Sequence, residues 1–555
     1  LSGEALMSRF SALWVVLLLC LWAASGGLCS AEQSPEPARY ISVDEVRPGM
    51  EAYCLTVFKG TEVEKFSLEV VSVIHNFRPG LDAILVRGTD ERFIQAGAVA
   101  GCSGSPVYID GRLAGALAFA WTYSKEPIYG VTPIADMLRV GTGKPYQTAW
   151  ADQADIGVAI DLSTPVDLDR AAEQFNAALT ERADYGALTA IPAPLIVSGL
   201  PAPAFEQLRA IAEPLGLMPV AGGGTSTEQS AEDTELSAGS TLVLPLVSGD
   251  IQMSVLGTVT EVVGDRVYGF GHYFLGYGPV DIPMATGRIH TVVSSMVRSF
   301  KLGSPGKIVG AVRADEATAI QGRLGAEAKT IPLTVRVDRY NDVRSRQYNC
   351  RVVDNRLLTP TLVPSVVSGA ALMLGSLPPD HTIRYDVTIG IADDKPVSYS
   401  NISTGIGLAE LTREVNGTLA LLMNNPYRKV AVTSLDCYVR LIPKSVIAHI
   451  WSAELSDSTV KPGDQVDIDV VLESVLAEKK RYHYSLKVPE DLRLGKYDLT
   501  IVGWRGYYDF LRKNAPYRFT AQNLDSLIES IRTVSYTHLR AHETSLHLVC
   551  RLLLE

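Results

Sequence analysis

Short apolar stretches separated by Gly, Pro and Asp run through residues 51–138 and predict β structure. Two of the clearest stretches are 66–74 and 107–109. The second is followed by Asp110-Gly111, a favoured two-residue hairpin turn because both positions tolerate positive φ. We therefore expect this part of the chain to fold as a β unit that contains a tight hairpin.

Apolar residues recur at helical spacing between residues 161 and 184 and predict a short helix, with Thr164 as a candidate cap. The apolar face of this helix consists of Leu168, Ala171, Phe175 and Leu179. A second helix is predicted over 204–213, where Pro214 ends it. The two helices would separate the first β unit from whatever follows.

Residues 221–240 lack aromatic and β-branched apolar residues, so they cannot bury enough surface to offset their ordering entropy. They are predicted to form a flexible linker. Alternation then returns at Ile251, Met253 and Val255 and predicts a second β unit. A later alternating stretch, 466–472, favours a β-sandwich near the C-terminus.

At 555 residues the chain is too long for one hydrophobic core, and its pattern predicts a mainly β protein of several domains. The predicted parts are a leader with upstream residues (1–31), a first β unit (32–145), a helical insert and linker (146–240), a second β unit (241–345), a β-sandwich-like domain (346–520), a truncated tail (521–533) and a terminal segment (534–555).

The composition excludes several classes of protein. Apolar residues make up 47% and charged residues 20% of the chain, which argues against wholesale disorder and against a protein with many membrane spans. The formal net charge is −11, and no basic face is concentrated in the sequence. We therefore expect no nucleic-acid partner, because phosphate binding requires such a face.

The N-terminal region has the pattern of an export signal. Arg9 supplies a positive start, and residues 11–24 form an apolar run that is shorter than a bilayer span. We expect cleavage after Ala31, with an uncleaved anchor as the alternative, and residues 1–6 precede the expected start at Met7. The predicted location is outside the cytoplasm, in the periplasm, the cell envelope or the medium.

Residues 534–555 resemble a translated sequencing adapter, so the natural C-terminus is expected to be missing. The three histidines and one cysteine of this segment are therefore given no weight as a metal site. Without this segment and the leader 1–31, four cysteines remain, and none lies in a CxxC motif, which excludes common zinc ribbons. In an oxidising compartment they allow one or two disulfides, with no pairing evident from the sequence.

The loop 101–106, Gly-Cys-Ser-Gly-Ser-Pro, is the strongest candidate for chemistry. Acyl transfer by serine requires a hydroxyl on a sharp turn, backbone N–H groups that bind the oxyanion, and a base. Gly101 and Gly104 permit unusual backbone angles on either side of Ser103. A simple Gly/Ser turn between two strands is the competing interpretation.

The context of this loop resembles a known family. Residues 101–118 are similar to the nucleophile loop and hairpin of chymotrypsin-like peptidases, and more closely to the SpoIVB peptidase family. Residues 49–61 and 129–133 resemble that family too, as do 257–260 and 269–272 beyond the linker. The resemblance implies a chymotrypsin-like double β-barrel and a serine endopeptidase activity that needs no cofactor or metal.

Position by position, the resemblance implies Ser103 as nucleophile, His272 as general base and Asp90 as the carboxylate that orients the base. The N–H groups of Gly101 and Ser103 are the expected oxyanion donors. Here the serine segment precedes the histidine segment, the reverse of the order in the sporulation enzyme. A triad is defined by geometry, so this order is acceptable if the two β units pack together.

Other residues compete for these roles. His75 would restore the order His, Asp, Ser, and His290 is a further candidate base. Cys102 is an alternative nucleophile because thiols are intrinsically better ones, although a small buried residue is the plainer interpretation.

The function predicted from the sequence is that of an exported serine endopeptidase acting on protein or peptide substrates. The alternative is a catalytically silent secreted binding protein that retains the peptidase fold. The sandwich is expected to provide docking or association with the cell envelope. Self-cleavage in the linker 221–240 is a third hypothesis, because flexible exposed segments are preferred sites of cleavage.

Overall fold

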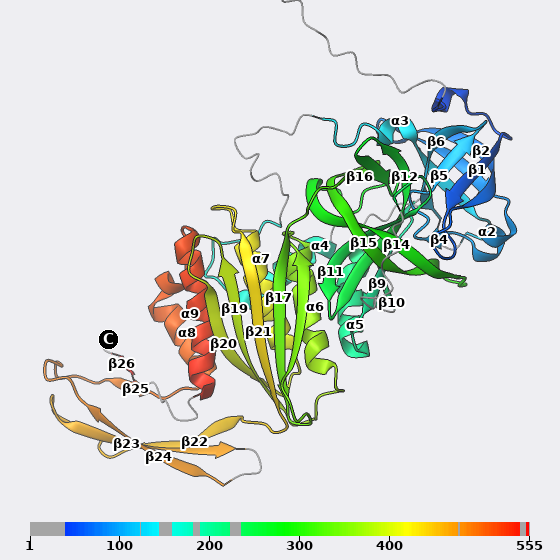
Figure 1. Cartoon of the computed structure of the whole chain (residues 1–555). Helices are drawn as coiled ribbons and strands as arrows, with labels where there is room; N and C mark the ends of the chain where they lie inside the picture. The colour runs from blue at the N-terminus through cyan, green and yellow to red at the C-terminus, as the bar shows by residue number, and fades with distance from the viewer. Residues whose placement is uncertain are drawn as a thin grey trace, which may run out of the picture.

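The computed structural model describes residues 39–121, 124–143, 158–180, 189–222, 235–474, 478–543 and 551–553 (Figure 1). The predicted export signal lies outside these residues, as does most of the predicted linker. Residues 235–240 of that linker are described and packed, because the Gly239 N–H donates to Val259 O at 2.8 Å. The described chain is mainly β, as predicted.

The first β unit is a closed, six-stranded antiparallel barrel with strand order β5-β1-β2-β3-β7-β6 and a β5–β6 pairing that closes it. Its elements are η1 (Val43–Glu45), β1 (Glu51–Thr56), β2 (Glu64–Arg78), β3 (Leu81–Gly88), α2 (Glu91–Ala96), β4 (Val99–Ala100), β5 (Pro106–Ile109), β6 (Arg112–Ala120), β7 (Ile128–Pro133) and α3 (Ile134–Met137). β4 leaves this barrel and pairs in parallel with β15 of the second one. The barrel lies within the predicted unit 32–145.

The predicted hairpin at Asp110-Gly111 joins β5 to β6 and is confirmed. Both residues have positive φ, 51° and 75°. That is the backbone geometry of the turn type that matches strand twist, and it explains why Asp-Gly is found here. The hairpin follows the loop 101–106 directly, so it fixes the direction in which the chain leaves that loop.

The second barrel is formed by six strands that lie within the predicted unit 241–345. Successive antiparallel pairings join β12, β13, β16, β15, β14 and β11, and a β11–β12 pairing closes the ring. The strands are β11 (Thr241–Gly249), β12 (Gln252–Val263), β13 (Arg266–Gly269), β14 (Gly278–Val293), β15 (Ser299–Glu316) and β16 (Ala319–Leu324). The chain is thus a double β-barrel, with the two barrels side by side (Figure 1).

The segment between the barrels contains both predicted helices. Its elements are α4 (Leu168–Thr180), β8 (Thr189–Ala190), β9 (Ala193–Ser198), α5 (Ala202–Ala212), η3 (Glu213–Leu215) and β10 (Leu217–Ala221). The first helix begins later than predicted, since Asp167 rather than Thr164 accepts from the N–H of Arg170, at 3.1 Å. Strands β9 and β10 pair in parallel and extend the second sheet through β12.

The region 346–520 differs from the expected β-sandwich. The second sheet continues from β11 through β18 (Arg346–Val353), β17 (Thr330–Arg339), β21 (Val432–Ile442), β19 (Thr382–Ile391) and β20 (Val397–Thr404). Helices cover it instead of a second sheet, namely α6 (Leu358–Leu372) and α7 (Ala409–Met423). Every residue of α6 is buried, so its apolar sequence carries no helical period to distinguish it from a buried strand.

The alternating strand at 466–472 belongs to a small separate sheet at the end of the molecule (Figure 1). This sheet consists of β22 (Ala448–Leu455), β23 (Gln465–Ser474) and β24 (Lys480–Lys487). The remaining elements are β25 (Asp498–Thr500), α8 (Trp504–Asn514), η4 (Pro516–Phe519), α9 (Leu524–Glu543) and β26 (Arg551–Leu553). None of the helices in the described part of the chain is long and apolar enough to cross a membrane.

Candidate active site

Ser103 lies in the loop that connects β4 to β5, and its side chain is fully buried. The loop folds on itself because the N–H of Cys102 donates to Val99 O at 3.1 Å and the N–H of Ser105 donates to Cys102 O at 2.9 Å. Gly101 and Gly104 adopt φ of 93° and 91°, a region that side chains rarely tolerate. The glycines therefore permit the sharp turn that the sequence predicted.

Strand β12 of the second barrel holds this loop from the other side. The Thr258 N–H donates to Ser103 O at 2.9 Å, and the Thr258 hydroxyl donates to Gly101 O at 3.0 Å. Thr260 adds a hydroxyl bond to Gly104 O at 2.7 Å. The position of Ser103 is thus determined by both barrels.

His272 follows β13, where Phe270 and Gly271 both have positive φ. The hydroxyl of Thr132, in the first barrel, donates to Gly271 O at 2.5 Å and ties this turn to β7. The imidazole Nε2 lies 2.9 Å from Ser103 Oγ, although the two residues are 169 positions apart. The structure therefore brings together the two residues that the sequence assigned as nucleophile and base.

The other imidazole nitrogen, Nδ1, lies 2.7 Å from Tyr273 O. A carbonyl oxygen only accepts, so Nδ1 carries the proton and Nε2 presents its lone pair to Ser103. Burial lowers the pKa of His272 to about 4, because the imidazolium would lose its contact with water. At neutral pH the imidazole is uncharged and in the tautomer that a general base requires.

Asp315, on β15, positions the loop that follows the histidine. Its two carboxylate oxygens accept from the N–H groups of Phe274, Leu275 and Gly276 at 2.7, 2.6 and 2.8 Å. The side chain is fully buried, and burial raises the pKa of Asp315 to about 6 although the three N–H bonds oppose this shift. The sequence reasoning missed Asp315, since nothing local links it to residues some forty positions earlier.

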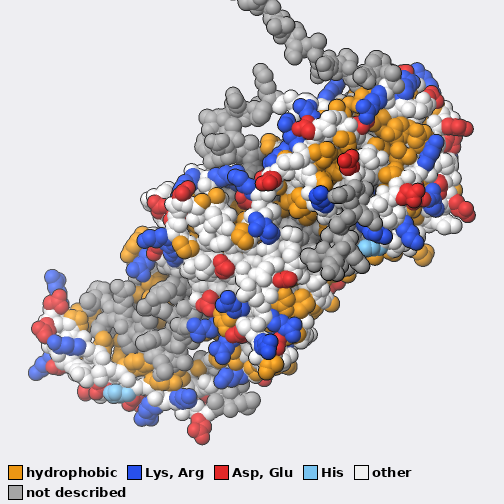
Figure 2. Space-filling view, in the orientation of Figure 1, with side chains coloured by type: hydrophobic (Ala, Val, Ile, Leu, Met, Phe, Trp, Pro, Cys, Tyr) orange, Lys and Arg blue, Asp and Glu red, His pale blue; other side chains and the backbone are white. Residues whose placement is uncertain are grey.

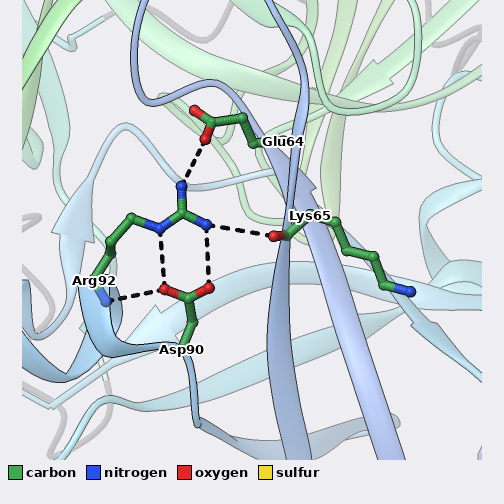
Figure 3. Close-up of polar contacts among 4 residues, drawn as sticks. All are labelled: Glu64, Lys65, Asp90 and Arg92. Carbon is green, nitrogen blue, oxygen red and sulfur yellow. Dashed lines mark hydrogen bonds and ion pairs between the residues drawn. The ribbon is translucent and has the colours of Figure 1, made fainter.

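Asp90 is not brought to His272, and this departs from the predicted triad. It is the N-cap of α2, where its Oδ1 accepts from the Arg92 N–H at 2.9 Å. Both carboxylate oxygens also accept from the Arg92 guanidinium, at 3.0 and 3.1 Å, and Arg92 reaches Glu64 and Lys65 O as well (Figure 3). The hydrogen bonds from Arg92 lower the pKa of Asp90, and the negative charge of Asp90 is paired with this arginine.

The competing residues lie in other environments. His75 is exposed, and its Nδ1 lies 3.0 Å from Asp82 Oδ2. His290 is exposed on β14. Cys102 is fully buried, and burial raises the pKa of its thiol, which opposes formation of the nucleophilic thiolate.

Lys301 is a second residue that the sequence reasoning missed. Its side chain is fully buried behind Gly101, and Nζ donates to the hydroxyls of Thr56 and Thr258 at 2.6 and 3.2 Å. Burial lowers the pKa of Lys301. Through Thr258, which in turn bonds Gly101 O, this amine supports the loop of Ser103 from behind.

The four cysteines outside both the leader and the terminal segment, Cys54, Cys102, Cys350 and Cys437, are buried free thiols and form none of the disulfides that the sequence allowed. Strand β17 lies between the strands that carry Cys350 and Cys437, which separates that pair. Among the described residues, no group of three or more His, Cys, Asp or Glu is arranged to hold a metal ion.

A serine hydroxyl aligned with a neutral imidazole, between two closed antiparallel barrels, defines a serine peptidase of chymotrypsin-like fold. Residues 26–138 match the family model of the SpoIVB peptidase S55, so this segment of the chain is similar to the SpoIVB peptidase family. The matched segment contains Ser103 and ends before His272. No curated protein and no solved structure matches the chain.

Proposed function

We propose that this chain is an endopeptidase that hydrolyses peptide bonds through a Ser103–His272 dyad. The observation that carries the proposal is the 2.9 Å contact between His272 Nε2 and Ser103 Oγ, with the imidazole in the correct tautomer. The carbonyl of Tyr273 takes the orienting role that the resemblance assigned to Asp90. The substrates are proteins or peptides, and the residues named need no cofactor.

In this mechanism His272 accepts the hydroxyl proton while Ser103 Oγ bonds to the carbonyl carbon of the substrate. The N–H groups of Gly101 and Ser103 are proposed to bind the resulting oxyanion. His272 then returns the proton to the leaving amine, and water releases the acyl group by the same steps. A carbonyl stabilises the imidazolium less than a carboxylate does, so we expect slower turnover than in a full triad.

Covalent labelling with a fluorophosphonate probe tests this proposal. We expect labelling between about pH 6 and 9, where the histidine base is neutral, and its complete loss in Ser103→Ala. Ser105→Ala is the matched control, since it removes a hydroxyl two positions away in the same loop. Failure to label the folded wild type and also the Ile191 variants described below would contradict the enzyme proposal.

One observation favours the alternative, a silent binding protein on the same fold. Ser103 is 0% exposed and His272 is 4% exposed, so the dyad is closed to solvent in this conformation. A protein that never opened this site would bind partners through its surface. On the face shown in Figure 2, acidic and basic side chains are interspersed, which suits protein partners better than nucleic acid.

We further propose export to the cell envelope or beyond, supported by the N-terminal sequence pattern. N-terminal sequencing of protein recovered from cell fractions tests this, with Ala31 as the expected last residue removed. Envelope association is proposed for the β22–β24 sheet, which exposes Ile450, Trp451 and Leu455. Loss of sedimentation with the envelope on replacing Trp451 by Ser is the expected result.

Self-cleavage in the linker remains a separate proposal. Residues 223–234 lie outside the described part of the chain, whereas 235–240 pack against β12, so we place the target before residue 235. Fragments of active protein and of Ser103→Ala are compared by N-terminal sequencing. Identical fragments in both would exclude self-cleavage.

A further inference from the structure

A short segment of the chain runs along the edge of β6, next to the dyad. Ala190 and Thr189 of β8 pair in antiparallel register with Phe119 and Ala120 of β6. The N–H of the next residue, Ile191, donates to Ala118 O at 2.9 Å. Three consecutive residues are therefore held by main-chain pairing, as an added strand is.

The carbonyl of Ile191 reaches the nucleophile. Ser103 Oγ lies 3.2 Å from Ile191 O and 2.9 Å from His272 Nε2. The hydroxyl has one proton, so it donates to the carbonyl or to the imidazole but not to both at once. An extended peptide strand beside the serine is the arrangement that acyl transfer requires, although the atom bonded to Oγ here is the carbonyl oxygen and not the carbonyl carbon that a serine attacks.

The same segment closes the site. Ile191 is buried in the apolar cluster of the first barrel, together with Val99, Cys102 and Ala120. A pocket adjoins Ile191 and Pro192, and one part of its wall is formed by the small residues Ala96, Ala98, Ala100 and Ala120, whereas Trp121, Met296 and Arg298 line other parts of it. The alanine side chains on one side of the pocket leave space there for an apolar side chain of a substrate.

We propose that the edge of β6 at residues 118–120 is the docking strand for the peptide substrate, and that residues 189–191 occupy it as a built-in substrate mimic. A substrate binds there in extended, antiparallel form, with an apolar residue at the position of Ile191 and its carbonyl facing Ser103. Binding requires displacement of the mimic. This inference rests on the proposed function.

Displacing residues 189–191 from the edge of β6 costs little free energy when a substrate takes their place. The contacts that hold the segment include a two-residue strand, one further hydrogen bond to Ala118, the bond from the Ser103 hydroxyl to Ile191 O and the buried side chain of Ile191. A substrate that makes the same main-chain bonds and buries a similar side chain replaces them nearly one for one. The exchange therefore favours whichever segment is present at the higher effective concentration, which keeps the free enzyme slow.

Two variants of Ile191 test this inference through the rate of fluorophosphonate labelling. Ile191→Gly removes the buried side chain, and Ile191→Pro removes the N–H that bonds Ala118 O. Each is expected to label at least about tenfold faster than wild type, the factor that corresponds to one lost packing or hydrogen-bond contribution. Ile308→Gly is the matched control, because Ile308 is 55% exposed on β15 and its removal leaves the site unchanged.

The outcomes separate this inference from the enzyme proposal. Equal labelling of wild type and both Ile191 variants, lost in Ser103→Ala, would overturn the substrate mimic and leave the peptidase in place. Slower labelling with a lower melting temperature in both variants would show that the segment is only a structural strand. Absence of labelling in every folded variant would end both proposals. If Ile191→Pro does not fold, Ile191→Gly decides alone.

Discussion

At the scale of single residues, His272 is prepared for proton transfer by burial and by one carbonyl. Tyr273 O selects the tautomer, and the low-dielectric surroundings hold the imidazole neutral. Asp315 acts one step further away, because it holds the N–H groups of the residues that follow the histidine. The proposed base is thus oriented by the backbone of its own loop.

His272 and Asp315 should influence stability in opposite directions as the pH changes. The pKa of His272 is lowered from 6.5 to about 4, so its contribution to the free energy of unfolding is present above 6.5 and lost as the pH falls to 4. The pKa of Asp315 is raised from 3.8 to about 6, so its contribution is present below 3.8 and lost as the pH rises to 6.

We therefore predict that His272→Gln loses less stability than wild type on acidification from pH 6.5 to 4, by up to about 3 kcal/mol. Urea unfolding at several pH values measures this difference, and His290→Gln controls for removal of an imidazole at an exposed position. The same pH-dependent difference in both variants would contradict the assignment to a buried neutral His272.

Asp90→Asn distinguishes the dyad from a triad. Because Asp90 bonds Arg92 and not His272, we expect the rate of labelling to stay within about threefold of wild type and stability to fall by about 1 kcal/mol at most. A triad carboxylate would instead lower turnover by about four orders of magnitude. His272→Ala, measured in parallel, should abolish activity, and an equal loss in Asp90→Asn would restore Asp90 to the mechanism.

At the scale of elements, the loop of Ser103 depends on β12. A Cβ added to Gly104 would lie 2.0 Å from Thr258 O, which is main chain and cannot move aside. Gly104→Ala is therefore expected to destabilise the protein by about 2 to 3 kcal/mol or more and to abolish labelling. Melting temperature and labelling are both measured.

Gly111→Ala provides the control for that substitution. Gly111 also has positive φ, at 75°, but a Cβ there would meet nothing within 4 Å. It should cost only the backbone strain, about 1 kcal/mol, and retain labelling. Equal effects at Gly104 and Gly111 would mean that the contact with β12 does not position the serine.

Elements with a local signal were predictable. The Asp110-Gly111 hairpin and the helices α4 and α5 follow from turn chemistry and apolar spacing, and the structure confirms them. Helix α6 was not predictable, because it is buried on all sides and contains Pro364, so neither period nor composition indicated a helix. The predicted β-sandwich is not observed here, because a helix covers the sheet where a second sheet was expected.

At the scale of the whole molecule, the site exists only where the two barrels meet. The first barrel supplies Ser103 and Thr132, and the second supplies His272, Thr258 and Asp315. The segment between the barrels returns to the first one as β8, which is how Ile191 reaches the dyad. The segment between the barrels thus connects them and also supplies the proposed substrate mimic.

The sequence alone determined what depends on local backbone demands and on motif. The glycines around Ser103 predicted a sharp turn, and the resemblance around His272 predicted the base. Only the tertiary structure decided which groups surround that base. Asp90 caps helix α2 and bonds Arg92, which lies two residues further along the chain. These short-range contacts, and not a contact with His272, determine where its carboxylate lies. The partners of His272 come instead from packing between segments far apart in sequence, which no local pattern records.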